Sequence, residues 1–342
     1  MSSPMPARFF FFLSLVLFAP FVHTQAISGH PEAALFVERM ERLHGFDAQE
    51  LQKRFARLTP DARVLELVAP PASPTQRSWT RYRSRFLEEQ RLEDGLVFWR
   101  ENAATLSRAS FLYGVPEEII VAIIGIETLY GRNTGSFNTF STLATLAFHD
   151  PRRAEFFRQE LEQLLLLARE QGRDPESYTG SYAGALGLPQ FMPGSLRRYA
   201  VDFDQDNLID LAGSAADAIG SVAHFLAQHG WREKAPVALP VDVAQVAPRH
   251  LQDWIDLGIR PTLGLAVLRE AGLRPRRGIA SEMPDAPATF VDLVTPEAPT
   301  EYWLGYENFY VITRYNRSSF YAMTVYQSAE ALAQRYRPPE QK

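Results

Sequence analysis

The chain has 342 residues, 46% of them hydrophobic, so it can bury a sizeable core and form two or three domains. Its formal net charge is −5, and no run rich in Lys and Arg is interleaved with aromatic residues, which excludes nucleic acid as an expected partner. The absence of cysteine excludes disulfides, thiolate chemistry and the acylated cysteine of a bacterial lipoprotein.

Residues 1–26 have the composition of a secretory signal. Arg8 precedes the apolar block FFFFLSLVLFAPF, and Ala26 is a small residue at a plausible cleavage position. The apolar block is short for a membrane span, which needs roughly 20 residues. We therefore predict a signal peptide and an exported, soluble protein without a stable membrane anchor; an uncleaved anchor is the alternative.

Residues 27–105 are predicted to form a helical N-terminal region. Apolar residues recur at spacings of three and four over 31–58, and the sequence GFD at 45–47 interrupts them, which predicts two short helices. Helical spacing resumes after a Pro-rich joint at 69–74.

Residues 106–235 continue in helical mode, with a strongly amphipathic helix predicted over 156–171. The pattern changes near Ala235, where prolines and valines become frequent. Within 236–342, β-branched and aromatic residues predict strands in TFVDLV and in YWLGYENFYVITRYN, and a helix closes the chain. The predicted class is α+β, predominantly helical.

A single carboxylate, Glu127, lies at the end of an apolar helix whose first position is expected at Pro116. Residues 119–126 carry no polar side chain, so this helix should be buried on every side. Burial without a paired cation raises the pKa of a carboxyl group, which suits a general acid. The alternative is a structural Glu127 that pairs with Arg132 or caps a loop.

Four glycines and two prolines surround Gln190, Phe191 and Met192 in GSYAGALGLPQFMPGS, residues 180–195. Glycine lets a backbone approach a ligand closely. The Gln190 amide can donate to and accept from hydroxyl or N-acetyl groups, and Phe191 offers an apolar face to a sugar ring. The segment is a candidate sugar-binding loop, or alternatively a tight connection between helices. Its glycine spacing excludes a nucleotide-binding loop.

The segment DFDQDNLID, residues 202–210, begins like a calcium-binding loop. The alternating acids are Asp202, Asp204 and Asp206. The sixth position is Asn207 instead of glycine and the twelfth is Gly213 instead of glutamate, so the standard pattern is not met. Asp217 closes the site if the loop is longer than twelve residues. Calcium binding and a solvated acidic turn both remain open.

The histidines carry a weaker signal. His224 and His229 are five residues apart, which does not align two ligands on one helix face, and His149 is followed by Asp150 and a proline. We expect all three to be structural. No Gly-x-Ser-x-Gly elbow is present to hold a serine nucleophile.

Several separated segments, taken in order, resemble the lytic murein transglycosylase B family, and the resemblance covers residues 30–335. The segments are IIGIETLYGR, FNTFSTLATLAFHDPRRAEFF, SYAGALGLPQFMPGS, YAVDFDQDNLIDL, ADAIGSVAHFLAQHGW and FYVITRYNRSSFYAMTVYQ. The resemblance implies a lysozyme-like catalytic core over 106–235 and a periplasmic, soluble, monomeric enzyme.

The implied reaction cleaves the β-1,4 bond between N-acetylmuramic acid and N-acetylglucosamine in peptidoglycan and leaves a 1,6-anhydromuramoyl end. Glu127 is implied as the sole acid and base, since substrate-assisted glycosidases do without a second carboxylate. No cofactor is required for this chemistry. The rivals are a hydrolytic muramidase with an unidentified second carboxylate and a non-catalytic peptidoglycan-binding scaffold.

The resemblance also assigns residues to binding roles. The implied groove residues are Arg152, Arg153, Ser181, Gln190, Phe191 and Tyr315. The implied ligands of a structural calcium ion are Asp202, Asp204, Asp206, Asp217 and the carbonyl of Leu208. His224-Phe225 stands where many relatives have Asn-Tyr, which affects one sugar contact. The expected partners are peptidoglycan glycan strands, and which cell-wall enzymes accompany the protein stays open.

Overall fold

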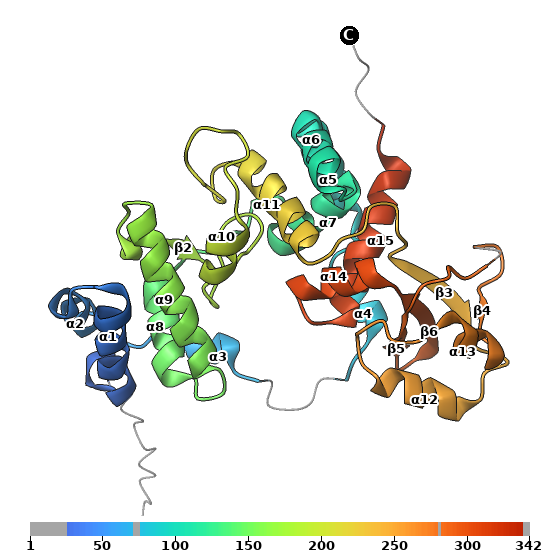
Figure 1. The fold of residues 1–342 in the computed structure, drawn as a ribbon, viewed down its shortest axis with the longest axis horizontal. Helices are drawn as coiled ribbons and strands as arrows, with labels where there is room; N and C mark the ends of the chain where they lie inside the picture. The colour runs from blue at the N-terminus through green and yellow to red at the C-terminus, as the bar shows by residue number, and fades with distance from the viewer. Residues whose placement is uncertain (1–25, 71–75, 280–281, 338–342) are drawn as a thin grey trace, which may run out of the picture.

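The computed structural model describes residues 26–70, 76–279 and 282–337. The predicted signal peptide lies outside the described residues except for Ala26, and most of the Pro-rich joint does too. The described chain is mostly helical, with one two-stranded and one four-stranded sheet (Figure 1). The predicted α+β, predominantly helical class is confirmed.

The N-terminal part is helical, as predicted. Its elements are η1 (Ile27–Gly29), α1 (Pro31–His44), α2 (Ala48–Ala56), α3 (Ala62–Val68), α4 (Trp79–Ser84), α5 (Glu89–Glu101) and α6 (Ala103–Tyr113). The break between α1 and α2 has a local cause. Gly45 ends α1 with a φ of 66°, and the Asp47 carboxylate accepts hydrogen bonds from two backbone N–H groups at the start of α2.

The middle of the chain is also mostly helical. Its elements are α7 (Glu117–Thr128), β1 (Phe137–Asn138), α8 (Thr139–His149), α9 (Ala154–Glu170), η2 (Pro175–Ser177), β2 (Thr179–Gly180), α10 (Pro193–Tyr199) and α11 (Ala215–Gln228). The helix α7 begins one residue later than expected, with Pro116 at its N-cap. Every residue of α7 from Ile119 to Gly125 is buried, as its apolar sequence predicts.

The last part carries the four-stranded antiparallel sheet, in the order β4-β3-β6-β5. Its elements are β3 (Ala238–Asp242), α12 (Pro248–Asp256), α13 (Leu265–Glu270), β4 (Arg274–Pro275), β5 (Thr289–Thr295), β6 (Ala298–Gly305), α14 (Glu307–Tyr315) and α15 (Ser319–Arg335). Figure 1 shows the sheet with α12 and α13 at one end of the molecule.

The prediction of strands over residues 302–316 is wrong in its second half, because β6 ends at Gly305 and α14 follows. A side chain at Gly305 would overlap the ring of Phe309, so the first turn of α14 folds back onto the end of the strand. The buried Asn308 amide donates to the backbone carbonyls of Arg232 and Ala235. These tertiary contacts override the β propensity of the aromatic and β-branched residues.

The chain has two hydrophobic cores. The smaller one lies between the sheet and the helices α12 and α13, and it includes Trp254 and Phe290. The larger one contains α7, which packs against α5, α6, α11 and α15.

Among the described residues no single helix is long and apolar enough to cross a membrane. The helices α6 and α7 together have the length and composition of a span, but they meet at an angle of 114°. The domain boundaries at 105 and 235 stay predictions.

Gly125 tests how tightly α7 is packed. A side chain at this position would overlap the phenol of Tyr130, which lies against the helix. Although Ala normally favours a helix over Gly, we expect Gly125→Ala to lower the free energy of unfolding by about 1–3 kcal/mol, as overpacked cores do. Chemical denaturation measures the change. Gly264→Ala is the control, since its side chain would enter open space, and an equal loss in both variants would contradict the argument.

Candidate active site

Glu127 occupies the last turn of α7, and a strained turn follows it. The Thr128 hydroxyl donates to the Leu188 carbonyl at 2.9 Å and accepts from the Gly131 N–H. Leu129, Tyr130 and Gly131 then adopt φ angles of 54°, 59° and 89° in succession. Consecutive left-handed residues with side chains are costly, and they persist only where surrounding contacts fix them. The end of α7 is therefore held in one position.

The side chain of Tyr130 supplies much of that fixation. Its ring reaches back between Gly95 of α5 and Gly125 of α7, where any larger residue would overlap its hydroxyl. Arg91 of α5 donates to the Gly125 carbonyl at 2.8 Å. The close approach of Tyr130 therefore requires glycine at both positions. One of them, Gly125, is two residues before Glu127.

Tyrosines surround the Glu127 carboxyl group. The Tyr321 hydroxyl of α15 donates to Glu127 Oε1 at 2.6 Å, and the Tyr315 ring stacks on Tyr321 at 6.3 Å between centroids. Tyr82 of α4 lies close enough for Glu127 to raise its pKa. Glu127 keeps a small accessible surface, but protein atoms surround most of it. The carboxyl group therefore lies in a largely aromatic environment, while part of the residue stays accessible.

Burial raises the pKa of Glu127 from 4.5 to about 7, and the hydrogen bond from Tyr321 opposes part of this rise. Within the described residues, Glu127 forms no ion pair. Arg132 pairs with Asp94 at 2.6 Å instead, so the alternative in which it neutralises Glu127 is not what the structure shows. Near neutral pH a large fraction of Glu127 therefore carries a proton that it can donate.

The glycine-rich segment 180–195 passes beside Glu127 and is anchored from several sides. The Leu188 carbonyl accepts from Thr128, and the Pro189 carbonyl accepts from the Tyr315 hydroxyl. The Gln190 side-chain amide donates to the carbonyls of Thr134 and Gly187, at 3.1 and 2.9 Å. Gln190 thus uses its NH₂ group to hold the loop, which leaves its side-chain oxygen for other partners.

The other predicted residues of this segment differ in exposure. Phe191 is only 3% exposed and packs on the rings of Phe225 and Tyr315, so it supports the wall of the site more than it offers an open face. The Ser181 hydroxyl accepts from the backbone N–H of Ala185 at 3.0 Å, and its own proton is left to donate.

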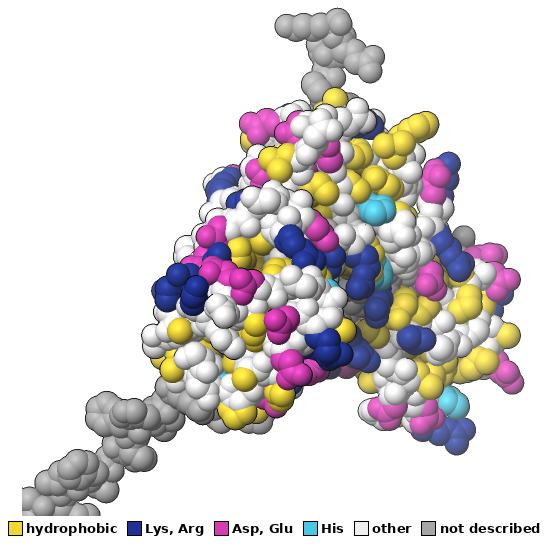
Figure 2. Space-filling view, turned by 60° about the vertical axis from the view of Figure 1, so that its left-hand side comes forward, with side chains coloured by type: hydrophobic (Ala, Val, Ile, Leu, Met, Phe, Trp, Pro, Cys, Tyr) yellow, Lys and Arg dark blue, Asp and Glu magenta, His cyan; other side chains and the backbone are white. Residues whose placement is uncertain are grey.

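Arg152 and Arg153 are exposed where α8 turns into α9. Arg152 donates to the Asp150 carboxylate at 3.1 Å and to the Val68 carbonyl at 3.0 Å. The Arg153 guanidinium lies over the Phe156 ring at 4.6 Å. Both cations are held in place by their own neighbours while facing solvent. Figure 2 shows a hollow in the middle of one face of the molecule, along which Lys and Arg side chains gather.

Three residues of the site were not predicted from the sequence: Tyr321, Tyr82 and Thr128. Tyr321 is 194 positions from Glu127 and reaches it only because α15 packs against α7. No local spacing could have linked them. Thr128 directly follows Glu127, but its hydrogen bond to Leu188 depends on the path of a loop 60 residues away.

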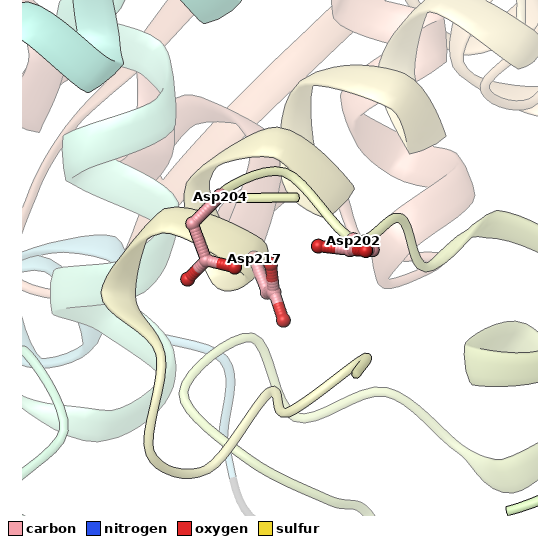
Figure 3. A group of neighbouring side chains, drawn as sticks. All are labelled: Asp202, Asp204 and Asp217. Carbon is pink, nitrogen blue, oxygen red and sulfur yellow. The ribbon is translucent and has the colours of Figure 1, made fainter. Parts of the chain in front are cut away.

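The predicted acidic loop brings three carboxylates together. Oxygen atoms of Asp202, Asp204 and Asp217 lie within 4.8 Å of one another (Figure 3). Asp217 is fully buried, and its two oxygens accept from the backbone N–H groups of Phe203 and Asp210 at 2.7 and 2.8 Å. Burial raises the pKa of Asp217, and these two bonds oppose the rise. None of the three forms an ion pair with a described cation.

The donor set fits calcium, which prefers several hard oxygen ligands. Asn207, at the position where the standard loop has glycine, adopts a φ of 70°, a conformation that asparagine tolerates. The Asp206 carboxylate accepts from the Leu208 N–H at 2.8 Å and lies outside this group of three, and its role as a ligand stays a prediction.

The histidines of α11 contact backbone atoms and aromatic rings. His224 Nδ1 lies 2.8 Å from the Tyr199 carbonyl, and His229 Nδ1 lies 2.8 Å from the Phe225 carbonyl. The His229 ring also stacks on Phe225 at 4.1 Å. The His224 contact joins α11 to the end of α10, the His229 contacts stay within α11 and its C-cap, and both agree with a structural role.

Known proteins match this chain along most of its length. The Transglycosylase SLT domain family matches residues 28–330. The membrane-bound lytic murein transglycosylase B of Escherichia coli K12 is 40% identical over 315 residues, which cover 90% of this chain and 84% of that protein. The crystal structure of the soluble lytic transglycosylase SltB1 of Pseudomonas aeruginosa superposes with a TM-score of 0.80 at 45% identity, covering 89% of this chain and 99% of that one.

Two further solved structures contain ligands. The lytic transglycosylase Slt35 of E. coli, in complex with calcium, gives a TM-score of 0.77 at 39% identity and covers 90% of this chain and 94% of that chain. SltB3 of P. aeruginosa, in complex with NAG-NAM-pentapeptide, gives 0.76 at 28% identity and covers 90% and 80%.

The lysozyme-like helical core and the buried acid at its centre, together with these matches, define a lytic murein transglycosylase, an enzyme that cleaves peptidoglycan. The chain belongs to the Transglycosylase SLT domain family. The predicted family and enzyme class are thereby confirmed.

The raised pKa of Glu127 makes stability depend on pH. Between pH 4.5 and about 7 the folded chain holds a proton that the unfolded chain has released, so stability falls as the pH rises through this window. Glu127→Gln mimics the protonated acid. We expect the variant to match the natural chain near pH 4.5 and to exceed it at pH 8 by on the order of 2 kcal/mol in free energy of unfolding.

Denaturation at the two pH values measures this difference. Glu155→Gln is the control, because Arg158 lowers the pKa of that exposed carboxyl and its loss should bring no gain at pH 8. A natural chain that is as stable as Glu127→Gln at pH 8 would show that Glu127 does not retain its proton.

Proposed function

We propose that this chain cleaves the β-1,4 bond between N-acetylmuramic acid and N-acetylglucosamine with Glu127 as its single acid and base, leaving 1,6-anhydromuramoyl ends. The observation that carries the proposal is the isolation of Glu127. Protein atoms surround most of it, it lacks a cationic partner among the described residues, and this partial burial raises its pKa to about 7. Such a group can donate a proton near neutral pH and take one back.

In the first step, protonated Glu127 gives its proton to the glycosidic oxygen as the bond to the anomeric carbon breaks. The N-acetyl group of the muramoyl residue stabilises the positive charge that develops at that carbon. Tyr321 then stabilises the Glu127 carboxylate through its hydrogen bond to Oε1. The acid is regenerated in the second step, when the carboxylate removes the proton of the C6 hydroxyl and the C6 oxygen closes the anhydro ring.

The surroundings of Glu127 favour this route over hydrolysis. A hydrolytic muramidase needs a second carboxylate to position water or to act as nucleophile. Burial and Tyr321 account for the pKa of Glu127, and no neighbouring carboxylate among the described residues contributes to it. The substrate's own C6 hydroxyl supplies the nucleophile that the protein lacks.

We also propose the substrate-binding roles of Arg152, Arg153, Ser181, Gln190, Phe191 and Tyr315. Exposed Arg152 and Arg153 are suited to carboxylates of the stem peptide, and Ser181 and Gln190 have hydrogen-bonding capacity left. Phe191 and Tyr315 form the wall. The complex of SltB3 with NAG-NAM-pentapeptide supports such a groove. Because peptidoglycan lies in the periplasm, we propose that the chain acts there as a soluble protein after signal cleavage.

The acidic loop is proposed to bind one structural calcium ion. Asp202, Asp204 and Asp217 would provide carboxylate oxygens, and the calcium complex of Slt35 supports the assignment. Asp206 and the Leu208 carbonyl complete the set that the family resemblance implies. The ion neutralises three clustered negative charges and ties the loop to the start of α11, and the chemistry at Glu127 proceeds without it.

Product mass tests the reaction. Purified peptidoglycan treated with the natural chain should release fragments that are one water lighter than hydrolysed fragments, since the C6 oxygen replaces water. Glu127→Gln should reduce the rate by at least about 10²-fold while keeping the binding of peptidoglycan, because general acid catalysis contributes 10²–10⁴-fold. Release of fragments with reducing ends only would indicate a muramidase, and unchanged lysis by the variant would overturn the role of Glu127.

Calcium should raise the thermal stability of the natural chain, because an ion that binds only the folded state stabilises it by mass action, about 2.7 kcal/mol at 100 times the Kd. Asp217→Asn should abolish the increase in melting temperature, whereas Asp253→Asn, an exposed acid on α12, should leave it intact. Thermal denaturation with calcium and with a chelator measures both. An equal calcium response in Asp217→Asn would remove the acidic loop as the site.

A further inference from the structure

A pocket of about 490 Å³ lies away from Glu127, between α15, the sheet and the turn after α4. Its size falls within the roughly 300–1,000 Å³ of ligand pockets. Trp303 of β6 and Tyr326 of α15 form two of its walls. Their rings meet edge to face, with 6.2 Å between centroids and an angle of 79° between planes. The two rings make an apolar corner with room on its open side.

Polar side chains line the rest of this pocket, and several of them have no partner. Glu301 of β6 and Glu330 of α15 form neither an ion pair nor a side-chain hydrogen bond with any described residue. The Tyr326 hydroxyl forms none either, and the Trp303 indole N–H is unsatisfied. A buried unpaired donor such as the Trp303 indole N–H is uncommon in folded proteins. Glu301 is half-buried and Glu330 is exposed, so water reaches their carboxylates and a ligand can reach them too.

The remaining polar groups are partly committed. Arg83 of α4 donates through Nε to the Gln327 side-chain oxygen at 2.6 Å, which fixes both planar groups at the rim. The terminal nitrogens of Arg83 and the NH₂ of Gln327 stay available as donors. Burial raises the pKa of Tyr326 to about 12, so its hydroxyl is neutral and can donate a hydrogen bond.

The pocket is separate from the catalytic groove. Tyr321, which contacts Glu127, and Glu330 are nine residues apart on α15 (330 − 321), which is two and a half helical turns. Their side chains therefore point to opposite sides of the helix, about 13.5 Å apart along its axis. Glu330 lies near Glu118 instead, at the start of α7, whereas Glu127 is at its end.

Aromatic faces combined with carboxylate and amide groups match the chemistry of a sugar. A pyranose ring presents apolar C–H faces that pack on aromatic rings, and hydroxyl and N-acetyl groups around its edge that donate and accept hydrogen bonds. Carboxylates that lack a cation are acceptors for hydroxyl donors. We propose that this pocket is a secondary glycan-binding site that holds an N-acetylated sugar of a peptidoglycan strand while another part of the polymer reaches Glu127.

This inference rests on the proposed function, because it assumes peptidoglycan as the polymer. The test therefore measures binding in the Glu127→Gln background, where no cleavage interferes. The probe is peptide-free glycan strands, prepared from peptidoglycan by removing the stem peptides with an amidase. Tyr326→Ala and Glu330→Gln should each weaken the affinity about fivefold, the effect of one lost hydrogen bond or ring contact of about 1 kcal/mol. Isothermal titration calorimetry gives the dissociation constants.

Phe111→Ala is the matched control, since Phe111 is 87% exposed on α6, outside the pocket, and its loss should leave the affinity unchanged. With Glu127 intact, Glu330→Gln should raise KM for long glycan strands without changing kcat, and it should leave cleavage of a short soluble tetrasaccharide unaffected. A general loss of structure would change KM, kcat and the cleavage of the tetrasaccharide together. Because Glu330 is exposed, its conservative replacement by Gln should preserve the fold.

Unchanged affinity in both pocket variants would overturn the proposal. A loss of affinity confined to peptidoglycan that retains its stem peptides, with peptide-free strands bound as before, would overturn it too, because the ligand would then be a peptide. The reaction assignment is read separately from product mass. Reducing ends among the products would refute the transglycosylase mechanism while the binding data still decide the pocket.

Discussion

The burial of one uncompensated carboxyl group at the end of α7 is the constraint on which the rest of this structure depends. Glu127 stays largely uncharged near neutral pH because protein atoms shield most of its carboxyl group from water and no described cation pairs with it. The apolar helix that carries it is enclosed by α5, α6, α11 and α15. The cost of burying an acid is a raised pKa. The same property makes it a proton donor near neutral pH, so the packing and the chemistry have one cause.

Several loops converge on this position through backbone hydrogen bonds. The Thr128 hydroxyl donates to the Leu188 carbonyl, and the Leu188 N–H donates to the carbonyl of Leu211, the residue after the acidic loop. Asp217, a member of the carboxylate cluster, accepts from the N–H of Asp210, next to Leu211. A continuous path of short contacts thus joins the proposed calcium site to the residue after Glu127. A structural ion can support the groove in this way without touching the substrate.

The site and the secondary pocket share α15. One side of this helix gives Tyr321 to Glu127, and the other side gives Tyr326 and Glu330 to the pocket. The sheet region supplies the facing wall through Trp303. The strand-bearing part has its own small core, which does not include Glu127. Its packing against the helical body places Trp303 opposite α15 and so completes the pocket. A polymeric substrate is long enough to use both surfaces.

Some elements of the fold and some site residues could be predicted from the sequence alone, because the local pattern of residue types determines them. The apolar run before Glu127 predicted a core helix with a terminal acid, the break at Gly45 predicted two helices, and the alternating acids predicted a carboxylate cluster. Side-chain spacing within one element is fixed by the geometry of that element, so these features can be read without a fold.

Only the tertiary structure decided which distant groups complete the site. Tyr321 is 194 residues from Glu127, the fully buried Asp217 joins Asp202 and Asp204 from the start of α11, and α14 formed a helix where its residues favoured a strand. In each case the energy of packing or of hydrogen bonding to a remote segment outweighed the local preference. Such contacts depend on how the helices are arranged around α7, and no spacing along the chain encodes them.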